Sequence, residues 1–262
     1  MTTGTTLAPA GKMATDFAGG VSDGTYGAEG LDYRRDEVSG KKGWFFLDDV
    51  VACLGAGMTG TNAITTVDQR LAEGPILTSA GSLARGLALR KGVDWILHGG
   101  EGYLFPQPQD VWAGMQPQTG SWKNVYTAGS DAKITRDVFS IWIDQAASPT
   151  YAYIVMPGAS AEKLQAYVKN PRVEILSNTP EVQAVREADV TEAVFYNAGR
   201  LQAGNLSMEA DGPCAIILRG GTGYVADPTQ KEKAVTVTIN GKATPVALPV
   251  GDMAGSTVKL AE

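Results

Sequence analysis

This sequence of 262 residues is short of the side chains that most often bind catalytic metals. It has one histidine, His98, and two cysteines, Cys53 and Cys214. A single histidine excludes any site with two histidine ligands, which includes most catalytic zinc sites. Both cysteines lie in apolar segments typical of strands, where two buried free thiols and a Cys53–Cys214 disulfide both fit the sequence. We predict neither a metal site nor a cofactor.

Positive charge and long apolar runs are also lacking. The formal net charge is −6 at pH 7, and charged residues make up 19% of the chain. A protein whose main partner is a nucleic acid needs a concentrated basic surface, so the composition argues against that partner. No apolar run approaches the length of a membrane span, and residues 1–12 have no apolar core of the kind found in a signal peptide. We expect neither nucleic acid nor membrane as a partner.

Helical patterns are rare, whereas short β-branched and aromatic runs that end at Gly or Pro recur along the chain. The clearest case is residues 139–158, FSIWIDQAASPTYAYIVMPG, which predicts two strands joined at a corner near Pro149. In the first strand both alternating sets contain large apolar residues, so we expect both of its faces to be covered. With 32 Gly and 13 Pro, the pattern is typical of an all-β protein.

Three other segments predict local structure. Residues 44–57 predict two strands joined at Asp48-Asp49, which fits a solvated bend better than a carboxylate pair for acid and base catalysis. Residues 93–106 predict a hairpin that turns at Gly99-Gly100. Residues 119–126 predict a turn followed by a strand.

One segment, residues 160–170, has the pattern of a helix. Ser160 is suited to cap it, and Leu164, Tyr167 and Val168 form one apolar face. Ser160 also begins an SxxK sequence, but the companion motifs of the serine enzymes that use SxxK are not convincing here. Helix capping explains this serine without them.

The C-terminal part contains a linker-like segment followed by a strong hairpin signal. Residues 227–230, DPTQ, precede a stretch of strict alternation around Asn240-Gly241. We therefore place a domain boundary here. Residues 1–227 are expected to form a large antiparallel β-sandwich, a supersandwich, and residues 228–262 a small C-terminal β unit.

Two apparent catalytic or cofactor motifs have structural explanations. Gly55 to Gly60 match GxGxxG, but a dinucleotide site needs a helix to begin there, and the residues that follow favour a strand. A catalytic triad with His98 as base is conceivable, yet the chain has no GxSxG motif and His98 stands at a predicted strand end. We expect a glycine turn and a structural histidine.

Arginine and aromatic residues that suit sugar binding are spread along the chain: Arg70, Trp122, Tyr126, Arg186 and Arg200. Aromatic faces stack on pyranose rings, and guanidinium groups form paired hydrogen bonds with uronate carboxylates. We select Arg70, Trp122 and Tyr126 as candidate carbohydrate-binding residues. Each also fits an ordinary packing or surface position.

A colinear set of segments covers nearly the whole chain: KKGWFFLDD at residues 41–49, LGAGM at 54–58, TTVDQR at 65–70, TGSW at 119–122, MPGAS at 156–160 and DPTQ at 227–230. In this order they resemble the C-terminal β half of the family 8 polysaccharide lyases, the hyaluronate, chondroitin AC and xanthan lyases. The corresponding family segments include KKSWFFFDD and ETTVENR. Ile64 stands where the family has the first Glu, and Asp68-Gln69 where it has Glu-Asn.

The resemblance implies an extracellular enzyme, a carbon-oxygen lyase that cleaves acidic polysaccharides of the hyaluronan, chondroitin or xanthan type by β-elimination. In the family a tyrosine, a histidine and an asparagine carry out the chemistry from an N-terminal α/α-toroid domain, without a cofactor. That domain is expected to be missing from this chain, so no catalytic residue is carried over. His98 matches a position in the β half, not the catalytic histidine.

Three hypotheses therefore stand. In the first, the chain is the β portion of a lyase that works with a separate or severed α-toroid domain. In the second, it is a stand-alone, non-catalytic carbohydrate-binding or structural module. In the third, it has its own active site on the β scaffold, with one of its nine tyrosines as the base. Fold alone does not choose among them, because function depends on the site.

Overall fold

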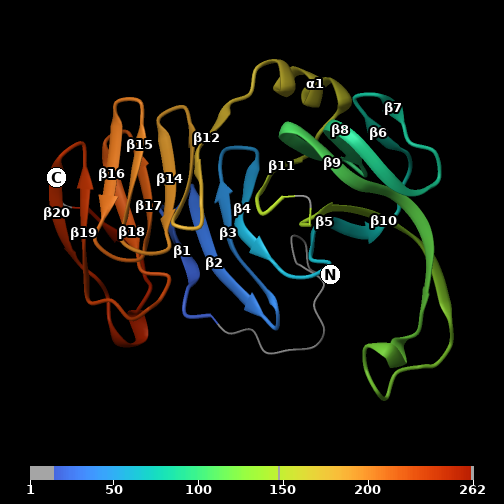
Figure 1. The fold of residues 1–262 in the computed structure, drawn as a ribbon, viewed down its shortest axis with the longest axis horizontal. Coiled ribbons are helices and arrows are strands. Elements are labelled where there is room, and N and C mark those ends of the chain that lie inside the picture. The colour runs from blue at the N-terminus through green and yellow to red at the C-terminus, as the bar shows by residue number, and fades with distance from the viewer. Residues whose placement is uncertain (1–14, 147, 261–262) are drawn as a thin grey trace.

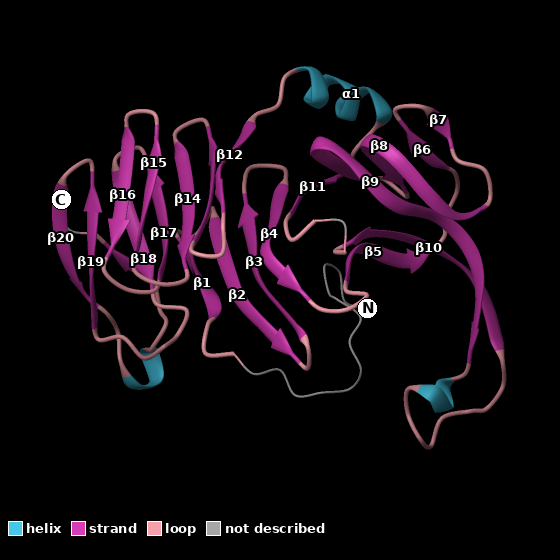
Figure 2. Cartoon of the chain, viewed as in Figure 1, coloured by secondary structure: helices cyan, strands magenta, loops and turns pink. Residues whose placement is uncertain are grey.

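The structure, a computed structural model, describes residues 15–146 and 148–260, and most of them form antiparallel sheets (Figures 1 and 2). The first sheet has eleven strands in the order β1-β2-β3-β4-β11-β9-β8-β6-β7, with β10 paired to both β9 and β5. Its strands are β1 Ala18–Ser22, β2 Gly27–Arg35, β3 Val38–Phe46, β4 Val51–Thr59, β5 Ile64–Leu71, β6 Ile76–Thr78, β7 Gly81–Ser82, β8 Gly86–His98, β9 Glu101–Gly120, β10 Ile134–Asp144 and β11 Tyr151–Pro157.

Two smaller sheets follow the helix α1 (Ala161–Lys169). The six-stranded sheet contains β12 Val173–Asn178, β13 Val182–Glu187, β14 Val190–Phe195, β17 Cys214–Arg219, β18 Thr222–Ala226 and β21 Val258–Lys259. The four-stranded sheet contains β15 Gly199–Ala203, β16 Leu206–Ala210, β19 Ala234–Ile239 and β20 Lys242–Ala247. The predicted all-β fold, built on a large antiparallel β-sandwich, is confirmed.

The six-stranded sheet is a middle layer with apolar residues on both faces. Val194 and Ile217 on one face share a core cluster with Phe45 of β3. Phe195 on the other face shares a second cluster with Met208 of the four-stranded sheet. The central strand β14 is therefore buried at every position. Alternating side chains of one strand can fill two cores because successive residues point to opposite faces.

The eleven-stranded sheet bends over a core of its own, to which β10 and β11 both contribute. Phe139, Ile141 and Ile143 on one face of β10 are buried. We expected both faces of this strand to be covered, but Trp142 on the other face is only half-buried. The outer face of β10 is therefore covered only in part: Ser140 is buried there, whereas Val138 and Trp142 are half-buried.

The strands β9 and β10 continue past the body of the protein as a two-stranded arm (Figures 1 and 2). A short 3-10 helix, η1 (Trp122–Asn124), lies at its tip, and a second one, η2 (Gly251–Met253), lies near the C-terminus. The prediction of a turn followed by a strand at residues 119–126 is therefore wrong. The structure has the reverse order, because strand β9 ends at Gly120 and the 3-10 turn follows it. The backbone amides of Asn124 and Val125 bond to carbonyls three residues earlier, which leaves no strand partner for them.

The helix α1 begins where the sequence predicts. The Ser160 hydroxyl accepts a hydrogen bond from the Lys163 amide, as an N-cap residue should. Leu164 and Tyr167 are buried, but Val168 is 42% exposed, so the predicted apolar face is narrower than expected. Val168 instead lies at the rim of a pocket. No helix in the described residues is long and apolar enough to cross a membrane.

Three of the predicted bends and turns are confirmed. Asp48 and Asp49 are both exposed in the connection between β3 and β4. Gly99-Gly100 joins β8 to β9, with φ angles of 56° and 80°. Asn240-Gly241 joins β19 to β20, with φ angles of 49° and 83°. Two successive positive φ angles match the twist of antiparallel strands and favour Asn and Gly.

The GxGxxG segment is part of strand β4 and its end, so it does not start a helix; the glycine turn that we expected is also wrong for residues 55–59, which continue the strand. A Cβ atom on Gly55 would lie 1.9 Å from the Tyr151 ring, so glycine is required for the two strands to pack. The cysteines are both buried and unpaired, which resolves the alternatives in favour of free thiols. Burial raises the pKa of the Cys53 thiol to about 12, so this thiol is protonated at neutral pH.

The segment after residue 227 does not form a separate sheet. The hairpin β19–β20 pairs with β16, and β21 pairs with β18. The predicted division between residues 227 and 228 stays a prediction, since shared sheets do not measure independent stability.

Candidate functional site

Arg70 lies on β5, an edge strand whose one partner in the described sheets is β10. Its Nε atom lies 3.1 Å from the Asp68 carboxylate, and a terminal nitrogen donates to the His98 carbonyl oxygen. The guanidinium also lies over the Phe139 ring, 6.0 Å from its centre. The side chain keeps 29% of its surface exposed. The Arg70 guanidinium is therefore held in place by contacts within the protein, while part of the side chain remains accessible to a ligand.

A pocket of about 310 Å³ lies beside Arg70, with Trp44, Glu101 and Tyr103 among the residues that line it. The Tyr103 hydroxyl donates to the buried Asp68 carboxylate, which orients both Tyr103 and Arg70. Burial, and then this hydrogen bond, raises the pKa of Tyr103 far above its ordinary value. Tyr103 is therefore a positioned hydrogen-bonding group and is unsuited to act as a base at neutral pH.

His98 is held in the protein interior by the backbone. Its Nε2 atom accepts a hydrogen bond of 3.0 Å from the Glu73 amide, and its Nδ1 atom lies 3.3 Å from the Pro75 carbonyl oxygen. These partners fix a neutral tautomer, with the proton on Nδ1. Burial lowers the pKa of the ring, consistent with that state. The arrangement gives His98 the structural role expected from the sequence.

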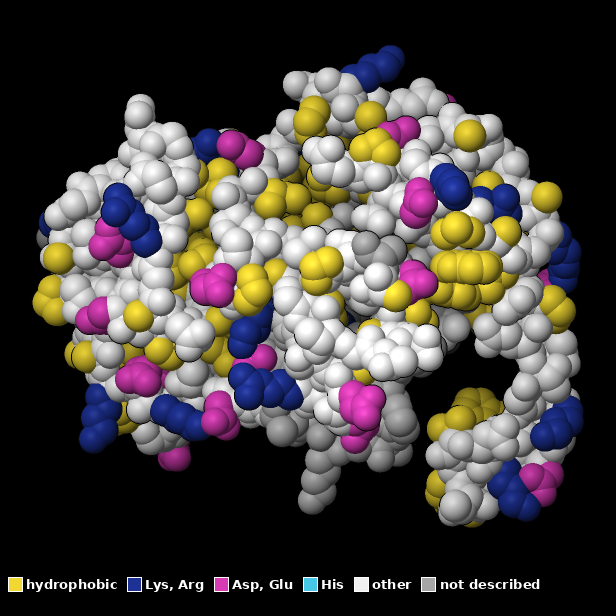
Figure 3. Space-filling model, in the orientation of Figure 1, with side chains coloured by type: hydrophobic (Ala, Val, Ile, Leu, Met, Phe, Trp, Pro, Cys, Tyr) yellow, Lys and Arg dark blue, Asp and Glu magenta, His cyan; other side chains and the backbone are white. Residues whose placement is uncertain are grey.

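Trp122 and Tyr126 lie together at the tip of the arm, where Figure 3 shows hydrophobic side chains gathered. The Tyr126 amide donates to the Trp122 carbonyl at 2.8 Å, and the Gly129 amide donates to the Tyr126 carbonyl at 2.8 Å. A Cβ on Gly129 would lie 2.7 Å from the Trp122 backbone, so glycine closes this loop. Trp122 and Tyr126 are 62% and 64% exposed. Their rings are available to a ligand.

The three predicted residues do not form one site. Arg70 pairs with Phe139 of β10, whereas the ladder of the arm ends at the pair of Ile134 and Gly120. At roughly 3.3 Å per residue, Phe139 and Ile134 are about 17 Å apart along the strand. Trp122 lies beyond that end. Arg70 belongs to the body and the two aromatic residues belong to the arm.

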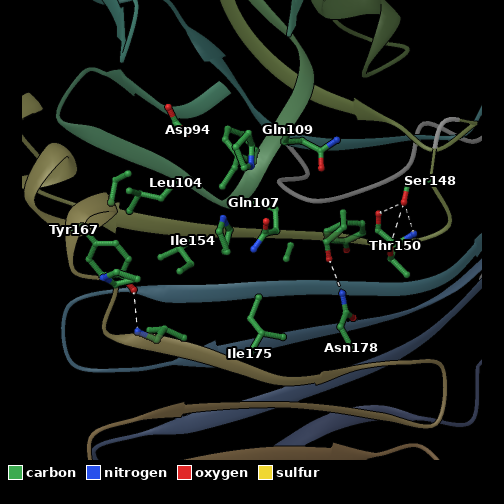
Figure 4. Close-up of a pocket in the computed structure, with 18 residues that line it drawn as sticks. Asp94, Leu104, Gln107, Gln109, Ser148, Thr150, Ile154, Tyr167, Ile175 and Asn178 are labelled. Atoms are coloured by element: carbon green, nitrogen blue, oxygen red, sulfur yellow. Dashed lines mark hydrogen bonds between the residues drawn. The ribbon is translucent and has the colours of Figure 1, made fainter. Parts of the chain in front are cut away.

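A second pocket, of about 570 Å³, opens between β9, β11, α1 and β12 (Figure 4). Its polar groups are mostly uncharged and include Gln107, Gln109, Thr150 and Asn178, and the last donates to the Tyr151 carbonyl at 3.0 Å. Asp94 is the one charged residue among those that line it. This lining suits neutral hydroxyl and amide groups better than an acidic ligand.

Sequence reasoning missed this second pocket, although a signal was present. Residues 106–109 read PQPQ inside β9. Strand β9 pairs with β11 up to Leu104 and with β10 from Trp112 onward. Residues 106–109 lie between these two ladders and pair with neither strand. Proline cannot donate a ladder hydrogen bond and is confined to edges and irregular pairing. The two prolines in β9 were therefore a sequence signal for the break in strand pairing at which the second pocket opens.

The described residues contain no group of three or more His, Cys, Asp or Glu arranged to hold a metal ion. The functional groups described at the two pockets and on the arm are mainly cations, amides and aromatic rings.

Comparison with known proteins identifies the family. The polysaccharide lyase family 8 super-sandwich domain matches residues 2–168, and the family's C-terminal beta-sandwich domain matches residues 174–236. Chondroitinase-AC of Pedobacter heparinus is 37% identical over 94% of this chain, and a hyaluronate lyase of Thermasporomyces composti is 32% identical over 86%. A solved chondroitinase AC lyase has a TM-score of 0.87 and 36% identity, and the match covers 94% of this chain and 40% of that one.

The chain spans much less than the full length of these relatives, 38% of the first and 31% of the second. The two family domains that match follow each other along the chain. The chain belongs to polysaccharide lyase family 8.

Proposed function

We propose that this chain is the β-sandwich portion of a lyase that cleaves acidic polysaccharides. The observation that carries the proposal is the match of two consecutive family 8 β domains across residues 2–236. The relatives are named for chondroitin, hyaluronan and xanthan, and we propose a substrate of this acidic class. A lyase acting on such polymers would meet them outside the cell, so we also propose an extracellular location.

The reaction would be a β-elimination. A base removes the C5 proton of the uronate, the C5–H electrons form a C4=C5 double bond, and the C4–O bond breaks. The leaving oxygen then takes up a proton. This needs a base and an acid near one sugar bond and donors that stabilise the developing negative charge.

We propose that the acid and base come from a helical domain, separate or severed, and not from the described residues. His98 has both ring nitrogens engaged by the backbone. Burial raises the pKa values of Tyr103 and Tyr153 beside the Arg70 pocket, the opposite of what a tyrosinate base requires. These observations also weigh against an active site rebuilt on the β scaffold.

In this proposal Arg70, Trp122 and Tyr126 contact the polymer. The open side of the Arg70 guanidinium would bind a uronate carboxylate, and the two exposed rings would stack on sugars. The exposed aromatic pair also favours the second candidate function, a non-catalytic carbohydrate-binding module. The two differ in whether the chain completes a catalyst.

The test is an activity assay with hyaluronan, chondroitin and xanthan, which follows the ultraviolet absorbance of unsaturated products. We expect no activity from the chain alone. Adding a separately produced α/α-toroid domain of a family 8 lyase should restore activity, and Arg70→Gln should reduce the restored rate. Activity of the chain alone, abolished by one Tyr→Phe change, would contradict the proposal. Binding without restored activity would favour the carbohydrate-binding module.

A further inference from the structure

The arm has a regular geometry that decides which side chains share a face. From the pair of Trp112 and Trp142 at its root, β9 and β10 stay in register without a bulge as far as Gly120 and Ile134. Opposite residues in an antiparallel pair point to the same side, and the side alternates along each strand. One face therefore carries the even-numbered residues of this ladder, among them Trp112, Gln116 and Gln118 of β9 and Trp142 and Arg136 of β10; Ser140, Val138 and Ile134 of β10 lie on it too. We call the even-numbered residues from Trp112 to Gly120 and from Ile134 to Trp142 the arm face.

The arm face lies on the side of the sheet away from the core. The other side of the root carries Phe139 and Ile141, which are buried, and Arg70 lies against that inner side over Phe139. Trp112 and Trp142 are half-buried on the outer side. The arm face and the Arg70 pocket are therefore distinct surfaces of one sheet.

The root of the arm face carries a stacked pair of aromatic rings, which we call the platform. The Trp112 and Trp142 rings are stacked, with centroids 5.9 Å apart and planes within 14°. Leu89, which pairs with Trp112 across the next strand, is 43% exposed and extends the platform. Figure 3 shows hydrophobic side chains gathered beside the root of the arm. The faces of indole rings are electron-rich and attract the C–H groups of a pyranose ring.

Beyond the platform the arm face carries amides and a cation beside two aliphatic side chains, Val138 and the exposed Ile134. Gln116, Gln118 and Arg136 are exposed, and Arg136 lies directly opposite Gln118. Arg136 has no carboxylate within 4.0 Å among the described residues, although other cations of the arm region do. Its hydrogen bond goes to the adjacent Thr135 carbonyl at 2.9 Å. A guanidinium in this state can bind a carboxylate or a sulfate with two parallel hydrogen bonds.

We propose that the arm face is an extended binding surface for an acidic polysaccharide, outside the Arg70 pocket. The inference rests on the proposed function, since it takes the same class of polymer. From Trp112 to Gln118 the surface runs about 20 Å at roughly 3.3 Å per residue, and it leads toward Trp122 and Tyr126 at the tip. A linear polymer fits a narrow ribbon whose stacking platform is followed by amides and a cation. A protein partner would favour an apolar centre surrounded by a polar rim.

The experiment measures the dissociation constants of the 262-residue chain for hyaluronan and chondroitin at low salt. Arg136→Gln removes the charge from an exposed position and should leave the fold intact. We expect it to weaken binding about tenfold, as for the loss of one charge-assisted contact. Trp142→Leu should weaken binding to a similar extent. Arg34→Gln, which removes an exposed arginine on β2, is the matched control and should bind like the wild type.

The outcomes separate this inference from the proposed function. If the wild type binds and both arm-face variants bind equally well, the inference is overturned while the proposed function stands. If the wild type binds neither polymer, the inference is overturned, and the activity assay with the added α/α-toroid domain decides the proposed function separately. If the variants keep polysaccharide binding but are no longer activated by the α/α-toroid domain, the arm face is a protein-docking surface and the inference is wrong. Should Trp142→Leu misfold, Arg136→Gln alone decides the result.

Discussion

Glu192 is a carboxyl group in the middle of the buried strand β14. Its side chain is fully buried, and no hydrogen bond of ordinary geometry reaches either of its oxygens among the described residues. Burial is the main cause that raises the pKa of Glu192 to about 9, and the nearby Asp23 and Glu187 carboxyls raise it further. The Gly27 backbone lowers this pKa, but by less than burial raises it. Folded Glu192 is therefore neutral at pH 7, whereas the same group in the unfolded chain is ionised.

This residue makes the stability of the protein depend on pH. Between its ordinary pKa of 4.5 and about 9, the unfolded chain holds fewer protons than the folded one, so the free energy of unfolding falls as pH rises. One such group contributes a slope of at most about 1.4 kcal/mol per pH unit. Glu192→Gln cannot titrate, so we expect its stability advantage over the wild type to grow from pH 5 to pH 8.5.

Urea unfolding at several pH values measures this difference. Glu174→Gln is the matched control, because Glu174 is exposed and paired with Arg186 at the surface. Its difference from the wild type should stay small and nearly constant with pH. Parallel pH profiles for Glu192→Gln and the wild type would show that Glu192 is ionised in the folded protein.

At the scale of elements, the helix α1 depends on one capping contact. The Ser160 hydroxyl satisfies the Lys163 amide, one of the amides left unpaired at the start of the helix. Ser160→Ala should lower the free energy of unfolding by about 1 kcal/mol, the usual effect of losing such a cap. Ser160→Thr keeps the acceptor and should lose less. Equal stability of the two variants in thermal unfolding would show that the cap is not the cause.

The elements that could be predicted are those with local signals. Ser160 caps a helix within three residues, and Asn240-Gly241 turns the chain within two. The arm could not be predicted in this way. Its strand β9 contains Pro106 and Pro108 and continues because it exchanges one distant partner, β11, for another, β10. Trp122 is exposed because the arm extends beyond the body of the protein, which the sequence pattern did not indicate. The same extension separates Trp122 from Arg70.

At the scale of the whole molecule, the layers could not be predicted because they depend on contacts between distant segments. Strict alternation predicts the β19–β20 hairpin, but nothing local indicates that Val237 pairs with Ala210 and closes a core with Phe195. Likewise, the burial of β14 on both faces links the two matched family domains through Phe45 and Val194. The family resemblance supplied what local patterns could not, the identity of the large sandwich.

Shared cores imply that the two matched family domains unfold together. All five tryptophans lie between Trp44 and Trp142, in the first domain, whereas far-ultraviolet circular dichroism reports on strands of both. We expect urea transitions followed by tryptophan fluorescence and by circular dichroism to coincide, as they do in two-state unfolding. Unfolding of the second domain alone would expose the Phe45 side of the core to water. A fluorescence midpoint clearly separated from the dichroism midpoint would mean that each domain is stable by itself.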